Sequence, residues 1–266
     1  MPSGNGEQSV AASPAQATVA PTWHTLVLVM WILGISLSGA SRLAMLRHTP
    51  GRLSIYAMTA VMELVLFGWV ALGLRLRNIP LRSIFGAIDG GIRAIARDLA
   101  IALVFWFGSL MILGTLGVAW AGADAMWKHL HPTPGQKAPE VSPQRQNARM
   151  LAQLAPANAQ EVAGWALLCM LVGLVEETVF RGYLQRQFSA WAGGGVTAGI
   201  VFSALIFGAA HGYQGVRSMV LLAVFGVLFG LLAHFRRSLR AGMFAHSWHD
   251  LITGLALALL RMHHIL

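Results

Sequence analysis

Two adjacent carboxylates and a guanidinium interrupt an apolar stretch of the chain. Residues 176–181 read Glu-Glu-Thr-Val-Phe-Arg and follow a long apolar run. On a helix, Glu177 and Arg181 lie four residues apart on one face and can form an ion pair, whereas Glu176 projects about 100° away around the axis. An ionisable residue at membrane depth is costly unless it is paired or solvated. The pattern therefore predicts an ion pair between Glu177 and Arg181, and a Glu176 that is free for chemistry.

Two later segments place histidines at helical spacing from other functional side chains. Phe207 and His211 are four residues apart, and so are His246 and Asp250. Residues at this spacing share one face of a helix. An antiparallel hairpin brings His211 level with Glu177, because each lies about 25 Å from the intervening glycine turn at 1.5 Å per residue. The spacing therefore predicts one site built from three helices.

Each of these groups also has an ordinary structural explanation. The glutamates and Arg181 can form a satisfied buried network, a single histidine is commonly a hydrogen-bonded core residue, and Phe207 can be simple packing. Their joint occurrence favours a catalytic or metal site, because lipid disfavours ionisable groups that have no function. His246 lies only about 9 Å into its predicted helix, so that helix must begin deeper or later than the others.

The composition places these residues in a membrane. Hydrophobic residues make up 56% of the 266, and charged residues only 11%. We predict an all-α polytopic bundle of about seven transmembrane helices, with six to eight compatible with the pattern. The predicted spans are 23–41, 54–74, 98–121, 163–188, 195–213, 216–235 and 240–260. The net charge of +9 comes from arginines between apolar blocks, which leaves no basic face for a nucleic acid.

The chain divides into three predicted regions. Residues 1–21 form a disordered tail without the basic start of a signal peptide. Residues 22–160 form an N-terminal transmembrane region that ends in a long polar loop, 123–160. Residues 161–266 form the C-terminal catalytic core. Between the second and third spans, residues 83–97 suit either an amphipathic helix on the membrane surface or a plain connector.

Several polar or small residues fall outside the three motifs. Glu63 lies in the middle of a predicted span, where a lone carboxylate is usually paired or protonated, and we assign it a structural role. Gly226 and Gly230 form a small-x-x-x-small pair suited to close helix packing. His249 either joins the site or lies at the interface. Cys169 is the single cysteine, which excludes a disulfide or a cysteine-based metal cluster.

Taken together, the three motifs resemble the signature of the CPBP family, the CAAX-protease and bacteriocin-processing membrane endopeptidases, also called Abi proteins. The motifs are Glu176-Glu177-Thr-Val-Phe180-Arg181-Gly182, Phe207-x-x-x-His211 and His246-x-x-x-Asp250, within residues 163–260. The resemblance implies an intramembrane endopeptidase that hydrolyses a peptide bond near the membrane surface. It implies that Glu176 and His211 activate the attacking water, and that Glu177 and Arg181, with Phe207 beside them, hold the site. The pair His246 and Asp250 would stabilise the oxyanion or hold a metal.

Asp250 departs from the form of the family in which the last motif ends in asparagine. An asparagine amide can donate a hydrogen bond to an oxyanion, whereas an ionised aspartate only accepts. Asp250 must therefore be protonated, orient His246 or ligate a metal. The set Glu176, His211, His246 and Asp250 suits zinc or another divalent ion with an open water position, and a metal-free mechanism is equally compatible.

Other classes of membrane protein fit the sequence less well. The chain has no His-Glu-x-x-His, Gly-x-Ser-Gly or Gly-x-Gly-Asp motif of other intramembrane proteases. A transporter or proton relay usually shows repeated halves, and none appears. A catalytically silent adaptor or immunity protein stays open. The expected partners are a lipid bilayer and a peptide or membrane-protein substrate, in a multi-pass protein of a prokaryotic plasma membrane; substrate identity, membrane orientation and oligomeric state stay open.

Overall fold

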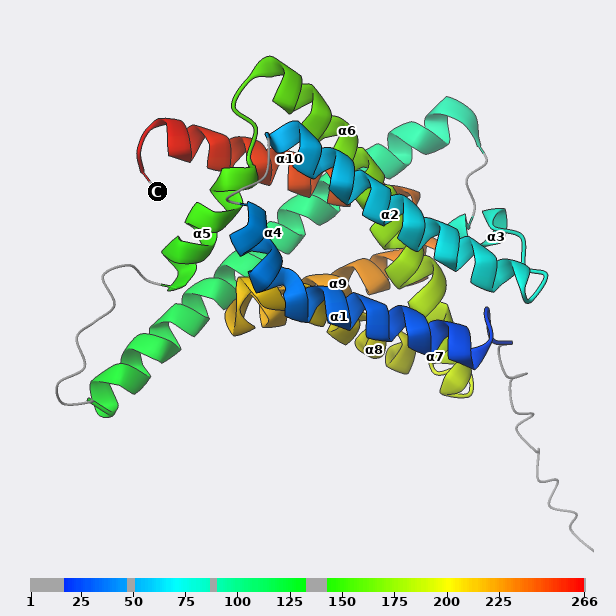
Figure 1. Cartoon of the computed structure of the whole chain (residues 1–266). Helices are drawn as coiled ribbons and strands as arrows, with labels where there is room; N and C mark the ends of the chain where they lie inside the picture. Colours follow the sequence, from blue (N-terminus) through cyan, green and yellow to red (C-terminus); the bar gives the residue numbers. More distant parts are fainter. Residues whose placement is uncertain (1–16, 47–50, 87–89, 133–142, 266) are drawn as a thin grey trace, which may run out of the picture.

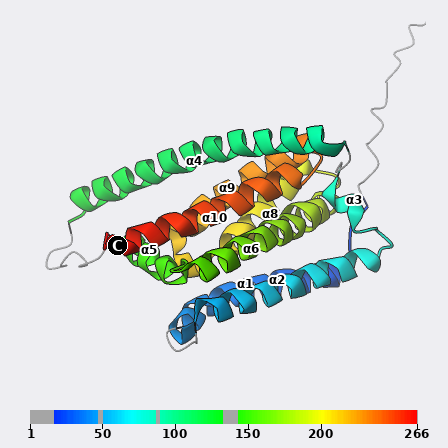
Figure 2. The same ribbon diagram turned by 90° about the horizontal axis from the view of Figure 1, so that it is seen from above.

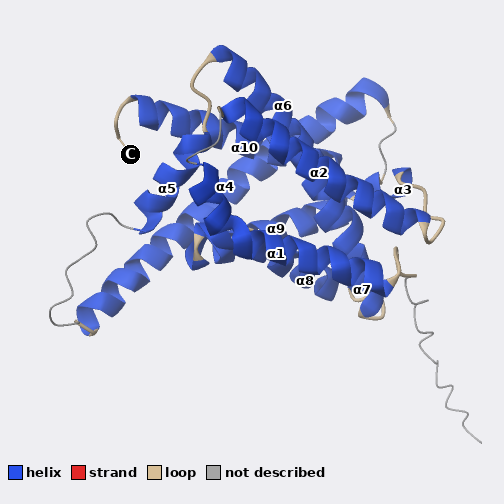
Figure 3. Ribbon diagram, viewed as in Figure 1, coloured by secondary structure: helices blue, strands red, loops and turns tan. Residues whose placement is uncertain are grey.

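The computed structural model describes residues 17–46, 51–86, 90–132 and 143–265, and these residues are helical almost throughout (Figures 1 and 3). Within those ranges there is no strand, and the only extended pairing is an isolated bridge between Gly86 and Ser238. The elements are α1 (Thr22–Leu46), α2 (Arg52–Arg75), α3 (Arg82–Phe85), α4 (Gly91–Leu130), α5 (Pro143–Leu154), α6 (Ala159–Glu176), η1 (Glu177–Leu184), α7 (Gln185–Trp191), α8 (Val196–Ala210), η2 (Gly212–Gln214), α9 (Val216–Arg236) and α10 (Arg240–Met262). The predicted all-α polytopic bundle is confirmed.

The long helices coincide with the predicted spans. The helical segments Arg52–Arg75, Gly91–Leu130, Ala159–Trp191 and Val216–Arg236 are long and apolar enough to cross a membrane. Thr22–Ser38 and α8 are apolar but shorter. The seventh predicted span corresponds to α10, which carries the ionisable side chains of the last motif. Apolar length was therefore a sufficient guide to where the helices lie.

Two predictions for the connections are wrong. The predicted surface helix or connector 83–97 is divided: α3 ends at Phe85, and Gly86 and Gly90 have φ angles of 75° and 109° before α4 begins at Gly91. These angles favour glycine and interrupt a right-handed helix. The predicted polar loop 123–160 is also too long, because α4 continues to Leu130 and the loop region contains α5.

The predicted disordered tail ends earlier than residue 21. Residues 1–16 lie outside the described residues. Val19 and Ala20 are buried, and their backbone N–H groups donate to the side-chain oxygen of Gln187 at 2.8 and 3.1 Å. The start of α1 is therefore fastened to α7.

The helices form three layers. Seen from above, α4 lies on one side, α1 and α2 lie on the other, and α6, α8, α9 and α10 lie between them (Figure 2). In the middle layer, α8 and α9 approach closely: a Cβ atom on Gly226 would lie 3.0 Å from the Cα of Ala204, and one on Gly230 would lie 3.0 Å from Ile200. The predicted close packing at these two glycines is confirmed.

The direction of each helix sets the depth of its side chains. Helix α10 runs opposite to α6, because Gly173 faces Ser247 while Gly254 faces Trp165. Helix α8 also runs opposite to the α6–α7 segment, since the Ser203 hydroxyl donates to the carbonyl of Phe180 at 2.6 Å. The second half of α6, the end of α8 and the middle of α10 are therefore at one level.

Candidate active site

Where the second half of α6, the end of α8 and the middle of α10 meet, the most deeply buried contact is an ion pair on a π-helical segment. Arg181 Nη1 lies 3.0 Å from Glu177 Oε1, and both side chains are only 1% exposed. The two residues belong to η1, a π-helix of eight residues. Segments of π-helix are rare and are often found at functional sites. The predicted ion pair is confirmed, although the π-helical geometry around it was not predicted.

Aromatic rings enclose the Arg181 guanidinium. Its central carbon lies 4.5 Å from the ring centre of Phe207 and 4.9 Å from that of Phe229. Such cation–π contacts are strongest where water is excluded. Space near Glu177 is equally restricted, because a Cβ atom on Gly242 would lie 2.9 Å from Glu177 Oε2. The cation and its carboxylate are therefore held in fixed positions.

His246 connects this ion pair to the rest of the site. Its Nδ1 lies 3.0 Å from Glu177 Oε1, and because a carboxylate only accepts, Nδ1–H is the donor. Its Nε2 lies 3.6 Å from Glu176 Oε2 and 3.7 Å from Asp250 Oδ2. The imidazole thus contacts Glu177 on one edge and faces the other two carboxylates on the opposite edge.

The depth of His246 is explained by where α10 begins. The preceding residue, Leu239, donates its N–H to the carbonyl of Phe85 at 3.0 Å, so the α9–α10 turn is covered by α3. The segment α6–α7, by contrast, continues to Trp191, well past Glu176. Because α10 starts inside the bundle, six residues bring His246 to the level of the glutamates.

Exposure separates the two adjacent glutamates. The Glu176 side chain is 18% exposed and that of Asp250 is 31% exposed, against 1% for Glu177. In the described part of the chain, Glu176 Oε2 has no hydrogen-bond partner. Glu176 and Asp250 therefore lie on the accessible side of the site, and Glu177 lies behind them.

His211 ends α8 and belongs to the same level. Its Nδ1 donates to the Phe207 carbonyl at 2.8 Å, which leaves Nε2 as the acceptor in the neutral ring. His211 interacts electrostatically with Asp250. Among the described residues, no hydrogen bond or ion pair joins His211 to Glu176.

Ser36 of α1 holds the turn that carries His211. Its hydroxyl donates to the Ala209 carbonyl at 2.5 Å and accepts from the Gly212 N–H at 3.0 Å. The two bonds flank His211 on both sides. Nothing in the sequence around Ser36 indicates this contact, because it depends on how α1 packs against α8.

Comparison with known families agrees with the motifs. The chain matches the family of type II CAAX prenyl endopeptidases described as Rce1-like over residues 158–252, which include all three motifs. We call this matched segment the CAAX-protease domain. No curated protein and no solved structure matches the chain. The CAAX-protease domain extends from α6 to the middle of α10, while α1 and α2 pack against it from outside the matched range.

His249 packs inside the CAAX-protease domain. Its ring centre lies 4.8 Å from that of Phe225, and its Nδ1 is buried without a hydrogen-bond partner among the described residues. It also interacts electrostatically with Asp250 and His246. His249 therefore lies beside the motif residues.

The proposed metal ligands do not form a ready metal site in the CAAX-protease domain. Within the described ranges, no group of three or more histidine, cysteine, aspartate or glutamate side chains has the spacing to hold a metal ion. His246 has only Nε2 left to bind a metal, because its Nδ1 donates to Glu177. Zinc at Glu176, His211, His246 and Asp250 stays a prediction for metal analysis to test.

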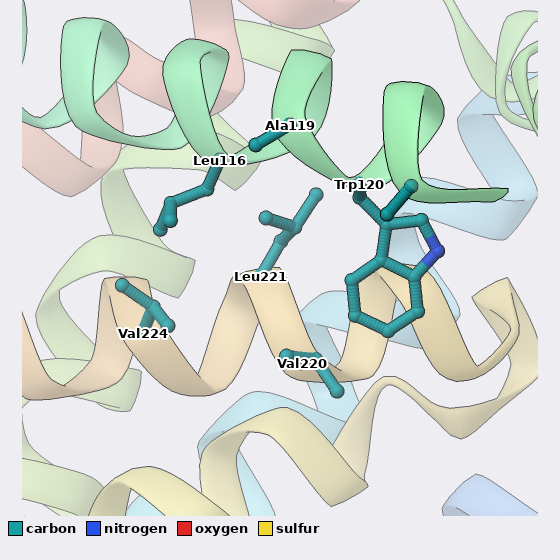
Figure 4. A pocket seen from close by; sticks show the side chains of 7 residues that line it. Leu116, Ala119, Trp120, Val220, Leu221 and Val224 are labelled. Carbon is teal, nitrogen blue, oxygen red and sulfur yellow. The ribbon is translucent and has the colours of Figure 1, made fainter. Parts of the chain in front are cut away.

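A separate groove lies outside the motifs, between α4 and α9 (Figure 4). Its lining is formed by apolar side chains: Leu116, Ala119, Trp120, Ala123, Val220, Leu221 and Val224. A groove of this chemistry cannot orient or hydrolyse a peptide bond. The ionisable residues of the CAAX-protease domain lie elsewhere.

Proposed function

We propose that this protein is an intramembrane endopeptidase in which Glu176 is the general base. The supporting observation is the division of the two glutamates: Glu177 Oε1 lies 3.0 Å from both Arg181 and His246, whereas Glu176 has no hydrogen bond among the described residues and is 18% exposed against 1%. A base must be able to accept a proton, and a carboxylate already bound by a guanidinium is a poor acceptor. Glu176 is the carboxylate of the pair that can do this work.

The proposed hydrolysis assigns one step to each of these side chains. Glu176 takes a proton from water as its oxygen attacks the carbonyl carbon of the substrate. His211, whose Nε2 is an acceptor, orients that water. The tetrahedral intermediate then collapses, the C–N bond breaks, and the proton held by Glu176 passes to the leaving amine.

His246 and Asp250 are proposed to stabilise the oxyanion together. With Nδ1–H bound to Glu177, a proton on His246 Nε2 makes that edge a donor toward the developing negative charge. Asp250 Oδ2 lies 3.7 Å from the same nitrogen and orients the charged ring electrostatically, so it acts through His246 rather than on the oxyanion. This role differs from that of an asparagine at the same position, which can donate directly.

The substrate is proposed to be a protein or peptide held in the membrane. The family description names prenylated CAAX substrates, which require a prenylating host. For a protein of a prokaryotic plasma membrane, peptide maturation or membrane-protein turnover is the expected task. A prenylated CAAX peptide and the same peptide without the prenyl group therefore form the first pair of substrates to compare.

Cleavage by the purified protein in lipid vesicles tests the assignment. Glu176→Gln and His211→Ala should abolish cleavage while the melting temperature is retained. Glu161→Gln is the matched control, because Glu161 lies at the start of the same helix and pairs with Arg52. Full activity in both site variants, or no cleavage of any membrane-anchored peptide by the unaltered protein, would refute the proposal.

Elemental analysis of the same preparations tests the role of a metal. Stoichiometric zinc in the unaltered protein that is lost in Asp250→Asn and in His246→Ala would assign these residues as ligands. Full activity after chelation, with no metal bound, would assign the reaction to the side chains alone.

A further inference from the structure

Glu63, on α2, is a buried carboxylate outside the three motifs and outside the family match. The residue is only 8% exposed, and its Oε2 has no hydrogen-bond partner in the described part of the chain. A buried polar group that only stabilises a fold is normally hydrogen-bonded. The structural role predicted for Glu63 therefore lacks the partner it requires.

The register of α2 against α6 and η1 places Glu63 near Glu176. Tyr56 and Trp165 pack with ring centres 5.4 Å apart near the starts of the two segments. Near their ends, His24 packs against Gly73 and bonds to the Tyr183 hydroxyl at 2.8 Å. The two segments therefore run in the same direction, with known contacts on either side of Glu63.

Counting residues along α2 from each of these two contacts places Glu63 beside the same part of α6. Glu63 is seven residues after Tyr56, which corresponds to residue 172 (165 + 7), and ten before Gly73, which corresponds to residue 173 (183 − 10). Both positions lie about one helical turn, or roughly 5 Å, from Glu176. A glutamate side chain can bridge that distance. In agreement, the strongest charge interaction of Glu63 is with Glu176, and weaker ones are with His246 and Asp250.

Carboxyl groups outnumber the cations at the level of Glu176. Four carboxyl groups, those of Glu63, Glu176, Glu177 and Asp250, face the cation Arg181 and the imidazole of His246. Two acceptor-only groups placed side by side repel each other, whereas a hydrogen bond between two carboxyl groups removes that repulsion. A carboxyl group beside Glu176 is therefore positioned to exchange a hydrogen bond with it.

We propose that Glu63 is a positioning residue of the active site, whose carboxyl group hydrogen-bonds Glu176 and fixes the orientation of the general base. The inference rests on the proposed function, and it assigns to α2 a part of the site that the matched range 158–252 does not contain. Glu63 acts through Glu176 and does not itself contact the reacting atoms.

Kinetics of two Glu63 variants test the proposal. Glu63→Leu should lower kcat by about 10- to 100-fold, with KM changed by no more than about twofold, because the base is misplaced while substrate binding is retained. Glu63→Gln can still hydrogen-bond Glu176 and should keep at least about a third of kcat. A kcat for Glu63→Leu within about twofold of the unaltered protein, or equal losses in the two variants, would overturn the proposal.

Two controls separate positioning from general damage. Val61→Leu changes an exposed apolar residue on the same helix and should leave both kcat and the melting temperature unchanged. Asp98→Asn removes a buried carboxylate on α4 that bonds Arg236 and Arg240, and it should lower the melting temperature without lowering kcat per folded molecule.

A thermal double-mutant cycle between Glu63→Leu and Glu176→Leu decides the contact independently of activity, because neither leucine can hydrogen-bond. Residues in contact give non-additive effects, so the double variant should depart from the summed melting-temperature shifts by about 2 °C or more. Additive shifts would refute the hydrogen bond. If the unaltered protein cleaves nothing, the proposed function fails and the cycle still tests the contact. If Glu176→Gln is inactive while Glu63→Leu is active, only the inference about Glu63 fails.

Discussion

Two buried ion clusters in this molecule differ in how completely their atoms are bonded. At the edge of the bundle, both oxygens of Asp98 are bound, Oδ1 by Arg236 at 2.8 Å and Oδ2 by Arg240 at 2.6 Å. In the middle layer, the Oε2 atoms of Glu176 and Glu177 have no hydrogen-bond partner among the described residues, and neither has that of Glu63 on the adjoining α2. Asp98 is as buried as Glu177, each being 1% exposed, so burial does not account for the difference.

The difference separates a cluster that holds helices together from one that can react. Asp98 ties α4 to the α9–α10 turn, and a fully bonded carboxylate has no capacity left for a substrate or a proton. Acceptors left unbonded in a buried site cost free energy, and that cost is expected where a function uses them. The comparison therefore marks the middle layer, and not the Asp98 cluster, as the place for chemistry.

The largest expected effect is on the rate after Glu176→Gln. Removing the general base should lower kcat by about 10²- to 10⁴-fold, because general base catalysis contributes a factor of that size. The melting temperature should change little, since the amide of the new glutamine can still hydrogen-bond Glu63 and the described residues give Oε2 no other partner. Peptide cleavage and thermal unfolding of the same sample measure both quantities. A large loss of stability would show that Glu176 belongs with Asp98 as a structural carboxylate.

Glu177→Gln should show the reverse: its main effect should be on the free energy of unfolding rather than on kcat. The change leaves the Arg181 guanidinium buried without its carboxylate, and breaking a buried pair in this way costs about 3–5 kcal/mol. Thermal or chemical unfolding in detergent measures the loss. Should Glu177→Gln prove as stable as the unaltered protein, Arg181 must be neutralised by Glu176 instead, and the assigned roles of the two glutamates would be exchanged.

Asp250→Asn should give an intermediate effect on the rate. An aspartate that orients the charged His246 ring across 3.7 Å contributes an ion-pair interaction, so kcat should fall roughly 10- to 100-fold. Initial rates at saturating substrate measure this. If Asp250→Asn cleaves faster than the unaltered protein, the orienting role is contradicted, because a direct donor to the oxyanion would then work better at this position.

Asp98→Asn should affect stability only. Two arginines lose part of a charged hydrogen bond, at a cost of about 1.5–3 kcal/mol in total. The unfolding free energy should fall by that amount, while kcat per folded molecule stays constant. A fall in kcat without a change in stability would end the distinction between the two clusters.

The smallest effect is expected from Ser36→Ala. Loss of its bonds to the 209–212 turn should cost about 0.5–1.5 kcal/mol and lower kcat severalfold by loosening His211. Ser38→Ala is the matched control, because Ser38 on the same helix donates only to the carbonyl of Ile35 in its own helix. Equal effects of the two substitutions would mean that Ser36 does not position His211.

The sequence predicted the helices well because membrane thickness restricts what an apolar stretch can be. It failed at α5, because the polar residues of this helix and its first residue, Pro143, are typical of a loop. Proline is well tolerated at the first position of a helix, where its missing N–H is not needed. It failed again at residues 83–97, where glycines with positive φ separate α3 from α4.

Contacts within one helix could be predicted at the site, and contacts between helices could not. The Glu177–Arg181 pair follows from spacing along one segment. The bond from His246 to Glu177 depends on where α10 begins, and the nearness of Glu63 to Glu176 depends on the register of α2. The local pattern of residue types encodes neither the starting point of α10 inside the bundle nor the register of α2 against α6.

The attachment of Val19 and Ala20 to Gln187 determines which parts of the protein share a side of the membrane. Gln187 is fully buried, accepts from Val19 and Ala20, and donates to the Ala20 carbonyl at 3.0 Å. Residue 19 is therefore fixed at the same end of the bundle as the 192–195 turn, close to α7 (Figure 1). Since α10 runs away from that end, an epitope placed before residue 17 and one placed in the 192–195 turn should be labelled from one side of the membrane, and an epitope after Leu266 from the other.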